Sequence, residues 1–356
     1  MRMSAVVLAT IAIAQIAFLA TVFVFLVARR LVEARRLARR AAERARLGSR
    51  IQDVLAHRLP PDAFAGALPR GRASVVTAGL QQGAMQVRGD EWNALTAAVR
   101  RSPWYQRNLK GRARSRLWWR RLVGTRLMAI VGDEHDVPDA VRLVADRHPG
   151  VRLAAVQLVR RLPYPELLES VLEQAIQAPR VTRQHYFDAL VSVRVPLGPI
   201  LLRRLDAPGG AYELRAMLTL AGQMADPELL DRLLAHAGSA SADARTQVAR
   251  ALGGYPHPRA RDALVILLRD KEWQVRTQAA SSLGMIRALD AREALQQALG
   301  DENWWVRLRA AIALRQLGEP GLDVLREARG GADRFASEMA GYILGLSDEA
   351  VADHAA

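Results

Sequence analysis

The chain has 356 residues, of which 50% are hydrophobic but only 5% are aromatic, and it contains no cysteine. The lack of cysteine excludes a disulfide framework and a thiolate metal site, and the small aromatic share suits helix-on-helix packing better than a sheet sandwich. The net charge of +15 is uneven, because residues 1–128 carry 24 basic and 6 acidic side chains, whereas residues 129–356 carry 27 and 30. The basic character therefore belongs to the first third of the chain.

An uncharged apolar run occupies residues 5–28, which read AVVLATIAIAQIAFLATVFVFLVA. A run of about 20 apolar residues is long enough to cross the hydrocarbon core of a bilayer as a helix. The apolar core of a cleaved signal peptide is shorter, and this run leads directly into Arg29 and Arg30. We therefore predict a retained transmembrane anchor over residues 1–28.

Nine arginines follow this anchor in residues 29–50, against only Glu33 and Glu43. The positive-inside rule places these arginines in the cytoplasm, so we expect a single-pass protein of a bacterial inner membrane with its N-terminus outside. Leucine and alanine recur at helical spacing, which predicts a basic juxtamembrane helix over residues 29–50. These arginines either bind anionic lipid headgroups or act as the charged flank that fixes the orientation of the anchor in the membrane. The two roles overlap, and the second is favoured.

Residues 51–117 are predicted to form a linker and a basic, aromatic helical segment. Proline and glycine are frequent in residues 51–90, where short helices are expected only at 51–58 and 74–86, and a helix is expected to begin with Asp90 as its N-cap. Residues 101–126 carry nine basic side chains and no acidic one, together with Trp104, Tyr105, Trp118 and Trp119. Three interpretations remain open: a solvated face that covers the first repeat, a surface for anionic lipid or an acidic partner, and a nucleic-acid site, which is the least favoured.

A repeat of about 31 residues dominates the rest of the chain. Asp270 to Gly284 matches Asp301 to Leu314 at an offset of 31, and a basic residue recurs at Arg121, Arg152, Arg183, Arg215, Arg245, Arg276 and Arg307. Each unit has the pattern of two helices, with proline near the start of the first and glycine near the end of the second. A single hairpin cannot bury its apolar face alone, so we predict stacked hairpins over residues 118–346 and a tail over 347–356.

The run VRTQAASSLGMIRALDAREALQQALGDENWWVRLRAAIALRQLG, residues 275–318, resembles the HEAT-like repeat of phycobilisome lyases. This resemblance implies an all-α chain, a right-handed α-solenoid of HEAT-like helical hairpins, here preceded by one transmembrane helix. It also implies an internal ladder that pairs Asp146, Asp270 and Asp301 with Arg152, Arg276 and Arg307 or with neighbouring repeats. The arrangement is similar to bacterial membrane HEAT proteins, some of which accompany glycosyltransferases, so a membrane enzyme of that kind is an expected partner.

Chemistry-bearing motifs are scarce. HEAT-type deoxyhypusine hydroxylases bind iron through recurring His-Glu pairs, and this sequence contains no His-Glu dipeptide. The only dense group of metal-ligating residue types, Asp133 to Asp136, falls in a single predicted loop, and no phosphate loop or nucleophile elbow is present. We therefore predict no enzyme activity, no cofactor and no metal. The alternative is an enzyme-associated HEAT protein, related to lyases or oxidoreductases, without a recognisable active site.

The predicted function is a scaffold or adaptor that binds another protein at the cytoplasmic face of the membrane. In such solenoids the second helices line a groove, and aromatic and arginine side chains are frequent interface anchors. Trp273 and Trp304 occupy equivalent repeat positions, for which packing between repeats is the favoured interpretation, while Trp305 breaks the repeat pattern and is the stronger binding candidate. The candidate binding residues are Trp305, Arg309, Trp273, Trp304, Arg245 and Arg250.

Overall fold

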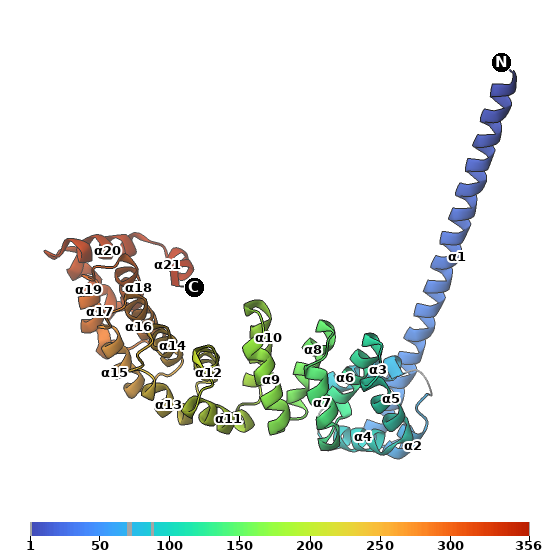
Figure 1. Cartoon of the computed structure of the whole chain (residues 1–356), viewed down its shortest axis with the longest axis horizontal. Helices are drawn as coiled ribbons and strands as arrows, with labels where there is room; N and C mark the ends of the chain where they lie inside the picture. Colours follow the sequence, from blue (N-terminus) through green and yellow to red (C-terminus); the bar gives the residue numbers. More distant parts are fainter. Residues whose placement is uncertain (1, 70–72, 87–88, 356) are drawn as a thin grey trace. The chain divides into compact units, whose positions relative to one another are not determined.

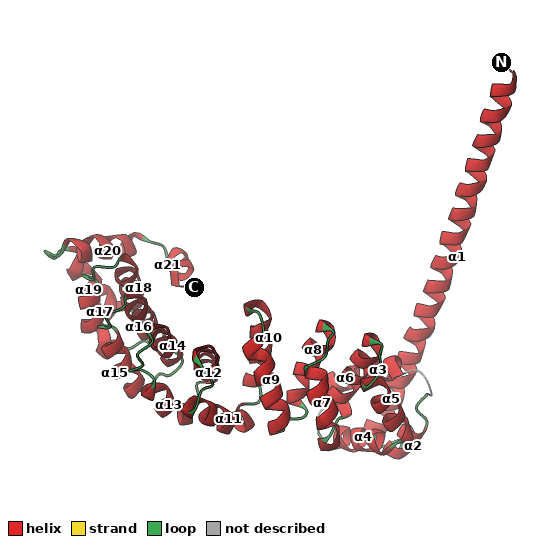
Figure 2. Cartoon of the chain, viewed as in Figure 1, coloured by secondary structure: helices red, strands yellow, loops and turns green. Residues whose placement is uncertain are grey.

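The computed structural model describes residues 2–69, 73–86 and 89–355, without the side chains of residues 2–14, 16, 17, 36, 40, 86, 110 and 355. The described residues form helices joined by short loops and contain no strand (Figure 2), in agreement with the expected all-α fold. The chain divides into two compact units, residues 1–161 and residues 162–356.

The first unit contains one very long helix and a set of short ones (Figure 1). Its elements are α1 (Arg2–Leu55), α2 (Pro61–Gly66), α3 (Ala73–Gln86), α4 (Asp90–Arg101), α5 (Pro103–Ala113), α6 (Trp118–Val131), η1 (Glu134–Asp136), α7 (Val137–Val144), α8 (Pro149–Val156) and η2 (Gln157–Arg160), where η marks a 3-10 turn.

Helix α1 runs without a break through the predicted anchor and the predicted juxtamembrane helix. Among the residues with described side chains, no helix has a stretch that is long and apolar enough to cross a membrane. The transmembrane span expected over residues 1–28 is therefore not found there, and half of its apolar run, residues 5–14, 16 and 17, lies outside the described side chains.

The described parts of residues 51–90, which were expected to form a linker, are folded onto the rest of the first unit. Phe64 of α2 and both Val76 and Leu80 of α3 are fully buried, and α3 packs against α1. The helices approach closely because Gly79 faces Leu47, where a Cβ atom would lie only 2.3 Å from a Leu47 methyl carbon. Apolar side chains at helical spacing thus draw this segment into the core despite its proline and glycine content.

The second unit consists of successive helical hairpins. Its elements are α9 (Pro165–Gln177), α10 (Arg180–Val191), α11 (Arg194–Asp206), α12 (Ala211–Met224), η3 (Pro227–Leu229), α13 (Leu230–Ala235), α14 (Ala242–Leu252), α15 (Pro258–Leu267), α16 (Trp273–Met285), η4 (Leu289–Ala291), α17 (Arg292–Ala298), α18 (Trp304–Gln316), α19 (Glu319–Arg329), α20 (Arg334–Gly345) and α21 (Asp348–Ala355).

The second helices of these hairpins, α12, α14, α16 and α18, stack side by side, and the first helices α13, α15 and α17 form a row behind them (Figure 1). Small residues allow the close stacking. A Cβ atom on Gly222 would lie 2.7 Å from the Cα atom of Ala251 in the next repeat, and one on Gly284 would lie 2.9 Å from the Cα atom of Ala313. We call the exposed side of α10, α12, α14, α16, α18 and α20 the second-helix face.

Candidate functional site

The recurring arginine makes the same contacts in each repeat where an aspartate is available. The Nε atoms of Arg121, Arg245 and Arg276 donate to carboxylate oxygens of Asp146, Asp270 and Asp301 at 2.5, 2.6 and 2.7 Å, and in each pair Nη2 reaches the other oxygen. In each pair the aspartate follows the arginine by 25 residues, so the bidentate contact joins one repeat to the next.

The resemblance left open whether each aspartate pairs within its own repeat or with a neighbouring one. In the structure, each aspartate carboxylate is bound by the arginine of the preceding repeat. The arginine of the same repeat approaches only the main chain: Nη1 of Arg152, Arg276 and Arg307 donates to the carbonyl oxygens of Asp146, Asp270 and Asp301. Each of these arginines therefore also ties down the loop that precedes its own helix.

These pairs change the ionisation of the carboxylates. Hydrogen bonds from Arg245 hold the pKa of Asp270 below its usual range. Burial alone would raise the pKa of Asp146, but hydrogen bonds from Arg121 and from the His148 main chain outweigh that effect and lower it. Arg245, expected to line a binding groove, is 7% exposed and committed to this ladder.

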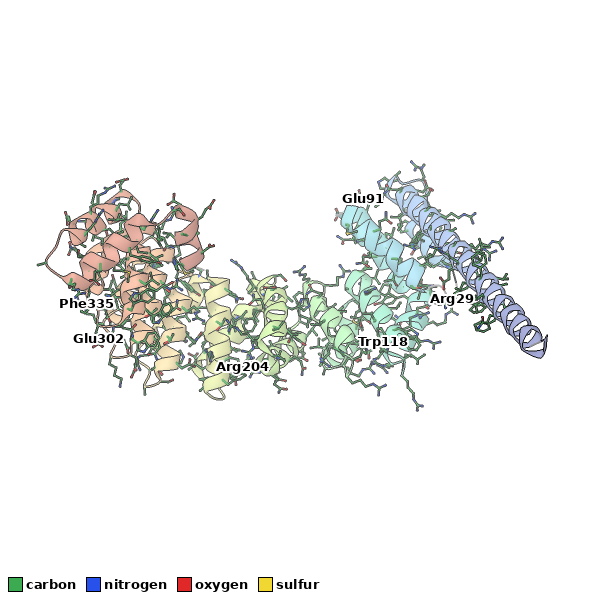
Figure 3. All side chains as sticks on the ribbon, turned by 90° about the horizontal axis from the view of Figure 1, so that it is seen from above. Arg29, Glu91, Trp118, Arg204, Glu302 and Phe335 are labelled. Atoms are coloured by element: carbon green, nitrogen blue, oxygen red, sulfur yellow. The ribbon has the colours of Figure 1, made fainter. Side chains whose placement is uncertain are left out.

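Large aromatic side chains form a row at the N-terminal ends of the last second helices. Trp273, Trp304 and Phe335 follow one another at intervals of 31 residues, and they are 38, 44 and 51% exposed. Figure 3 labels Phe335, which belongs to α20. The two tryptophans, for which packing was the favoured interpretation, therefore present much of their surface to solvent. We call Trp273, Trp304 and Phe335 the aromatic row.

Two further aromatic side chains extend the aromatic row. The rings of Trp304 and Trp305 meet edge to face with centroids 4.8 Å apart, and Trp305 is half exposed. Between α18 and α20, a pocket of about 300 Å³ is lined by Trp304, Arg307, Phe335, Glu338, Met339 and Tyr342. Arg309, another predicted binding residue, donates to the carbonyl oxygen of His354 in α21.

The ladder is interrupted where the aspartate is missing. The residue 25 positions after Arg307 is Ala332, and the guanidinium of Arg307 instead lies 4.6 Å from the centroid of the Phe335 ring. Likewise, Pro208 stands 25 positions after Arg183, whose guanidinium lies 5.0 Å from the centroid of the Tyr212 ring. A cation–π contact takes the place of the ion pair in both repeats.

A polar hollow of about 740 Å³ opens on the second-helix face beside this interruption. Its lining includes Arg250, a predicted binding residue, and three arginines that were not predicted to bind. We call it the arginine groove and define it by Arg180, Arg183, Arg215 and Arg250, which come from α10, α12 and α14. Arg250 also donates to the side-chain oxygen of Gln278 at 3.1 Å.

Part of the basic segment 101–126 is engaged in contacts within the first unit. Trp104 and Tyr105 are buried, while Arg114 pairs with Asp139 at 3.0 Å and Arg121 belongs to the ladder. Trp118 remains partly exposed and stacks on His148 with ring centroids 4.1 Å apart. Among the side chains that the structure describes, three of the nine basic ones here form ion pairs, Arg101 with Asp62, Arg114 with Asp139 and Arg121 with Asp146, so the three interpretations of this segment stay open.

The acidic loop 133–136 has a structural role. The Tyr105 hydroxyl donates to the Asp136 carboxylate at 2.5 Å, and the Asp133 side chain caps the short η1 turn by accepting from the His135 main chain. Within the described residues, no group of three or more His, Cys, Asp or Glu side chains could hold a metal ion.

Phe335, Tyr342 and three of the four groove arginines, Arg180, Arg183 and Arg215, were not recognised as binding candidates from the sequence. A signal existed for Phe335, because it lies 31 residues after Trp304, but the failure of the arginine pattern at Glu338 obscured it. The signal for Arg183 and Arg215 was weaker. Both were recognised as repeat residues, but the absence of their aspartate partners was not noticed.

Comparison with known proteins places the repeats. Residues 198–284 and 264–340 match the family model of HEAT repeats. No curated protein matches the sequence.

Three of the solved structures that match this chain are described next. YibA from Escherichia coli is 16% identical, covers 76% of this chain and 97% of its own length, and gives a TM-score of 0.35. An engineered protein is 15% identical, with coverages of 80 and 88% and a TM-score of 0.34. Kap121p, solved bound to RanGTP, is 14% identical with a TM-score of 0.35; the match covers 81% of this chain but only 47% of Kap121p.

Proposed function

We propose that this chain is a non-enzymatic HEAT-repeat scaffold whose second-helix face binds a protein partner. The observation that carries this proposal is the aromatic row. Three large aromatic side chains stand at the same position of three consecutive repeats, and each leaves more than a third of its surface exposed.

Stability alone does not require this exposure. Trp273, Trp304 and Phe335 lie in the first turn of their helices, directly after the N-cap or one residue later, where a polar residue is also compatible with a helix. Tryptophan is among the residues most enriched at the energetic centres of protein interfaces, and contiguous exposed apolar surface marks interaction sites. Trp305 contacts Trp304 of the row, and Tyr342 lines the pocket between α18 and α20 together with Trp304 and Phe335.

The proposal includes a membrane anchor formed by residues 5–28. This run is uncharged, and nine arginines follow it. Phe18, Phe23 and Phe25 on helix α1 are largely exposed, and a bilayer would cover such a surface. Orientation by the positive-inside rule puts the repeats in the cytoplasm of a bacterium, where the partner would be a membrane enzyme such as a glycosyltransferase.

The anchor can be tested separately from the scaffold. The full chain should remain in the membrane pellet after alkaline carbonate extraction, whereas a chain lacking residues 1–28 should be released. Release of the full chain by carbonate would eliminate the anchor and leave the scaffold proposal standing.

Site-specific photo-crosslinking tests the scaffold itself. A photoreactive phenylalanine analogue at Trp305 should yield one discrete protein adduct in cells. The matched control is the same analogue at Ile266, which is 73% exposed but lies on α15, a first helix. Equal adducts at both positions, or none at Trp305, would refute a partner on the second-helix face.

A further inference from the structure

The arginine groove concentrates positive charge that the protein leaves largely unmatched. Arg180 and Arg183 come from α10, Arg215 from α12 and Arg250 from α14. Burial, and after it the nearby charges of Arg215 and Arg180, lower the pKa of Arg250. Holding four guanidinium groups together costs free energy that a bound anion would offset.

The carboxylates near the groove do not balance these charges. Glu213 accepts a hydrogen bond of 2.7 Å from Arg204, which lies outside the groove, and Asp188 accepts from Gln184 at 2.7 Å. Asp243 lies 3.6 Å from Arg215 and is the one carboxylate that forms an ion pair with a groove arginine among the described residues.

The groove coincides with the missing rungs of the ladder. In the complete rungs an aspartate lies 25 residues after one recurring arginine and 6 before the next. Between Arg183 and Arg215 these two positions are Pro208 and Gly209, and after Arg215 they are Ala240 and Ser239. Neither interval provides the carboxylate that Arg121, Arg245 and Arg276 receive.

Arg183 shows the consequence at the atomic level. Its Nη2 atom donates to the Ala178 carbonyl oxygen at 2.9 Å and to the Tyr212 hydroxyl. Its Nε atom, which binds the aspartate in every complete rung, is buried and has no hydrogen-bond partner among the described residues. A buried donor without an acceptor is costly, so this position favours a carboxylate from outside the chain.

We propose that the arginine groove binds an acidic segment of a protein partner, whose carboxylates take the place of the missing aspartates. The fold already binds carboxylates bidentately through three arginines at this repeat position, which favours a carboxylate over a phosphate. Gln184 and Gln223, whose amides hydrogen-bond to each other at 3.3 Å, also line the groove and add polar surface beside the arginines. The segment lies across α10, α12 and α14, apart from the aromatic row.

This inference rests on the proposed scaffold function and adds the chemistry of the partner. A defined peptide probe tests the inference separately from the scaffold proposal. A fluorescein-labelled oligoglutamate peptide is titrated with the full-length protein in a mild nonionic detergent, and binding is followed by fluorescence anisotropy. The peptide should bind at low salt and bind more weakly as salt rises. A negative result here would leave the crosslinking result at Trp305 unchanged.

Two variants of equal charge test where the peptide binds. The double variant Arg180→Gln with Arg215→Gln removes two exposed groove arginines, and we expect about a tenfold loss of affinity for each, because charged hydrogen bonds are lost. The control, Arg292→Gln with Arg329→Gln, removes two exposed arginines of the second unit outside the groove and should bind like the wild type. Circular dichroism confirms that both are folded.

Competition defines the ligand class. Unlabelled oligoglutamate should displace the probe, while inorganic phosphate at matched ionic strength should not. Absence of peptide binding, equal losses in the two double variants, or displacement by phosphate or a single-stranded oligonucleotide at lower concentration than by peptide would overturn the proposal.

Discussion

Arg276 binds both carboxylate oxygens of Asp301, with its Nε and Nη2 atoms at 2.7 and 2.9 Å from them. Its remaining terminal nitrogen donates to the carbonyl oxygen of Asp270, whose own carboxylate is held by Arg245. One side chain thus links its own loop to the loop of the next repeat, and the same construction recurs one repeat earlier. Since a solenoid is stabilised by contacts between neighbours, these links should matter more than surface ion pairs.

Removal of one ladder carboxylate should destabilise the second unit. Asp270→Ala leaves Arg245, whose side chain is 9% exposed, without its partner, and we expect a loss of about 3 kcal/mol in the free energy of unfolding. The control Asp262→Ala breaks the exposed contact with Arg261 and should cost less than about 1 kcal/mol. Urea denaturation followed by circular dichroism measures both. Equal midpoints for the two variants would contradict a structural role for the ladder.

The ladder should also impose a pH dependence. The pKa of folded Asp270 is depressed by Arg245, so its contribution to stability is full above the unfolded pKa of about 3.9 and is lost as pH falls through the folded pKa. The difference in urea midpoint between the wild type and Asp270→Asn should therefore be constant from neutral pH to mildly acidic pH and shrink below it. A difference that grows on acidification would contradict this assignment.

The buried pair of the first unit should respond in the opposite direction. Burial, more than any other cause, raises the pKa of Asp136, and the hydrogen bond from Tyr105 partly counters it. Tyr105→Phe removes that bond and should cost about 1–3 kcal/mol. Since a raised folded pKa means that stability is lost as pH rises through it, the deficit should be larger at neutral than at acidic pH.

Thermal unfolding of Tyr105→Phe at several pH values measures this effect, with Tyr164→Phe as the control. Tyr164 is partly exposed, and the loss of its hydroxyl should change little. A deficit for Tyr105→Phe that is the same at all pH values would show that Asp136 does not ionise in the folded protein.

Two glycines of the second unit should tolerate alanine very differently. A Cβ atom at Gly284 would lie 2.9 Å from the Cα atom of Ala313, so Gly284→Ala should push α16 and α18 apart and cost about 1–3 kcal/mol. A Cβ atom at Gly341 in α20 would have no neighbour within 4 Å, and Gly341→Ala should stabilise the helix by about 0.5–1 kcal/mol. Urea midpoints that shift in the same direction would contradict the packing argument.

The repetition in the sequence explains which features could be predicted. The hairpins are set by local patterns, such as Pro165 and Pro258, which begin α9 and α15. Gly284, expected at or near the end of a second helix, is the penultimate residue of α16. Its second role, which is to allow the close approach of Ala313 in α18, depends on the neighbouring helix and could not be read from one repeat. For the same reason, the partner of each aspartate could not be fixed from one repeat alone: the pairing depends on how consecutive repeats stack.

Tertiary contacts also determine the conformation of the segment that was expected to be a linker. Pro60, Pro61 and several glycines suggested an irregular chain over residues 51–90, but α2 and α3 are held in place by the burial of Phe64 and Val76. The proposed binding surface includes residues that the sequence had singled out. Trp304 was selected by its spacing from Trp273, and Trp305 because it breaks the repeat pattern. The arginine groove, in contrast, arises from aspartates that are absent, which a search for motifs does not reveal.

The most direct test of the scaffold proposal is quantitative affinity purification of the full-length protein in mild detergent, with the co-purifying proteins identified by mass spectrometry. The variant replaces Trp273, Trp304 and Trp305 by serine. Its control replaces three exposed apolar side chains outside the second helices, Val195, Ile266 and Leu289, by serine. We predict that one stoichiometric protein is recovered with the wild type and the control and is lost with the tryptophan variant, while all three remain folded. Equal recovery with the tryptophan variant and the control, or no stoichiometric protein with the wild type, would contradict a protein-binding scaffold that uses the aromatic row.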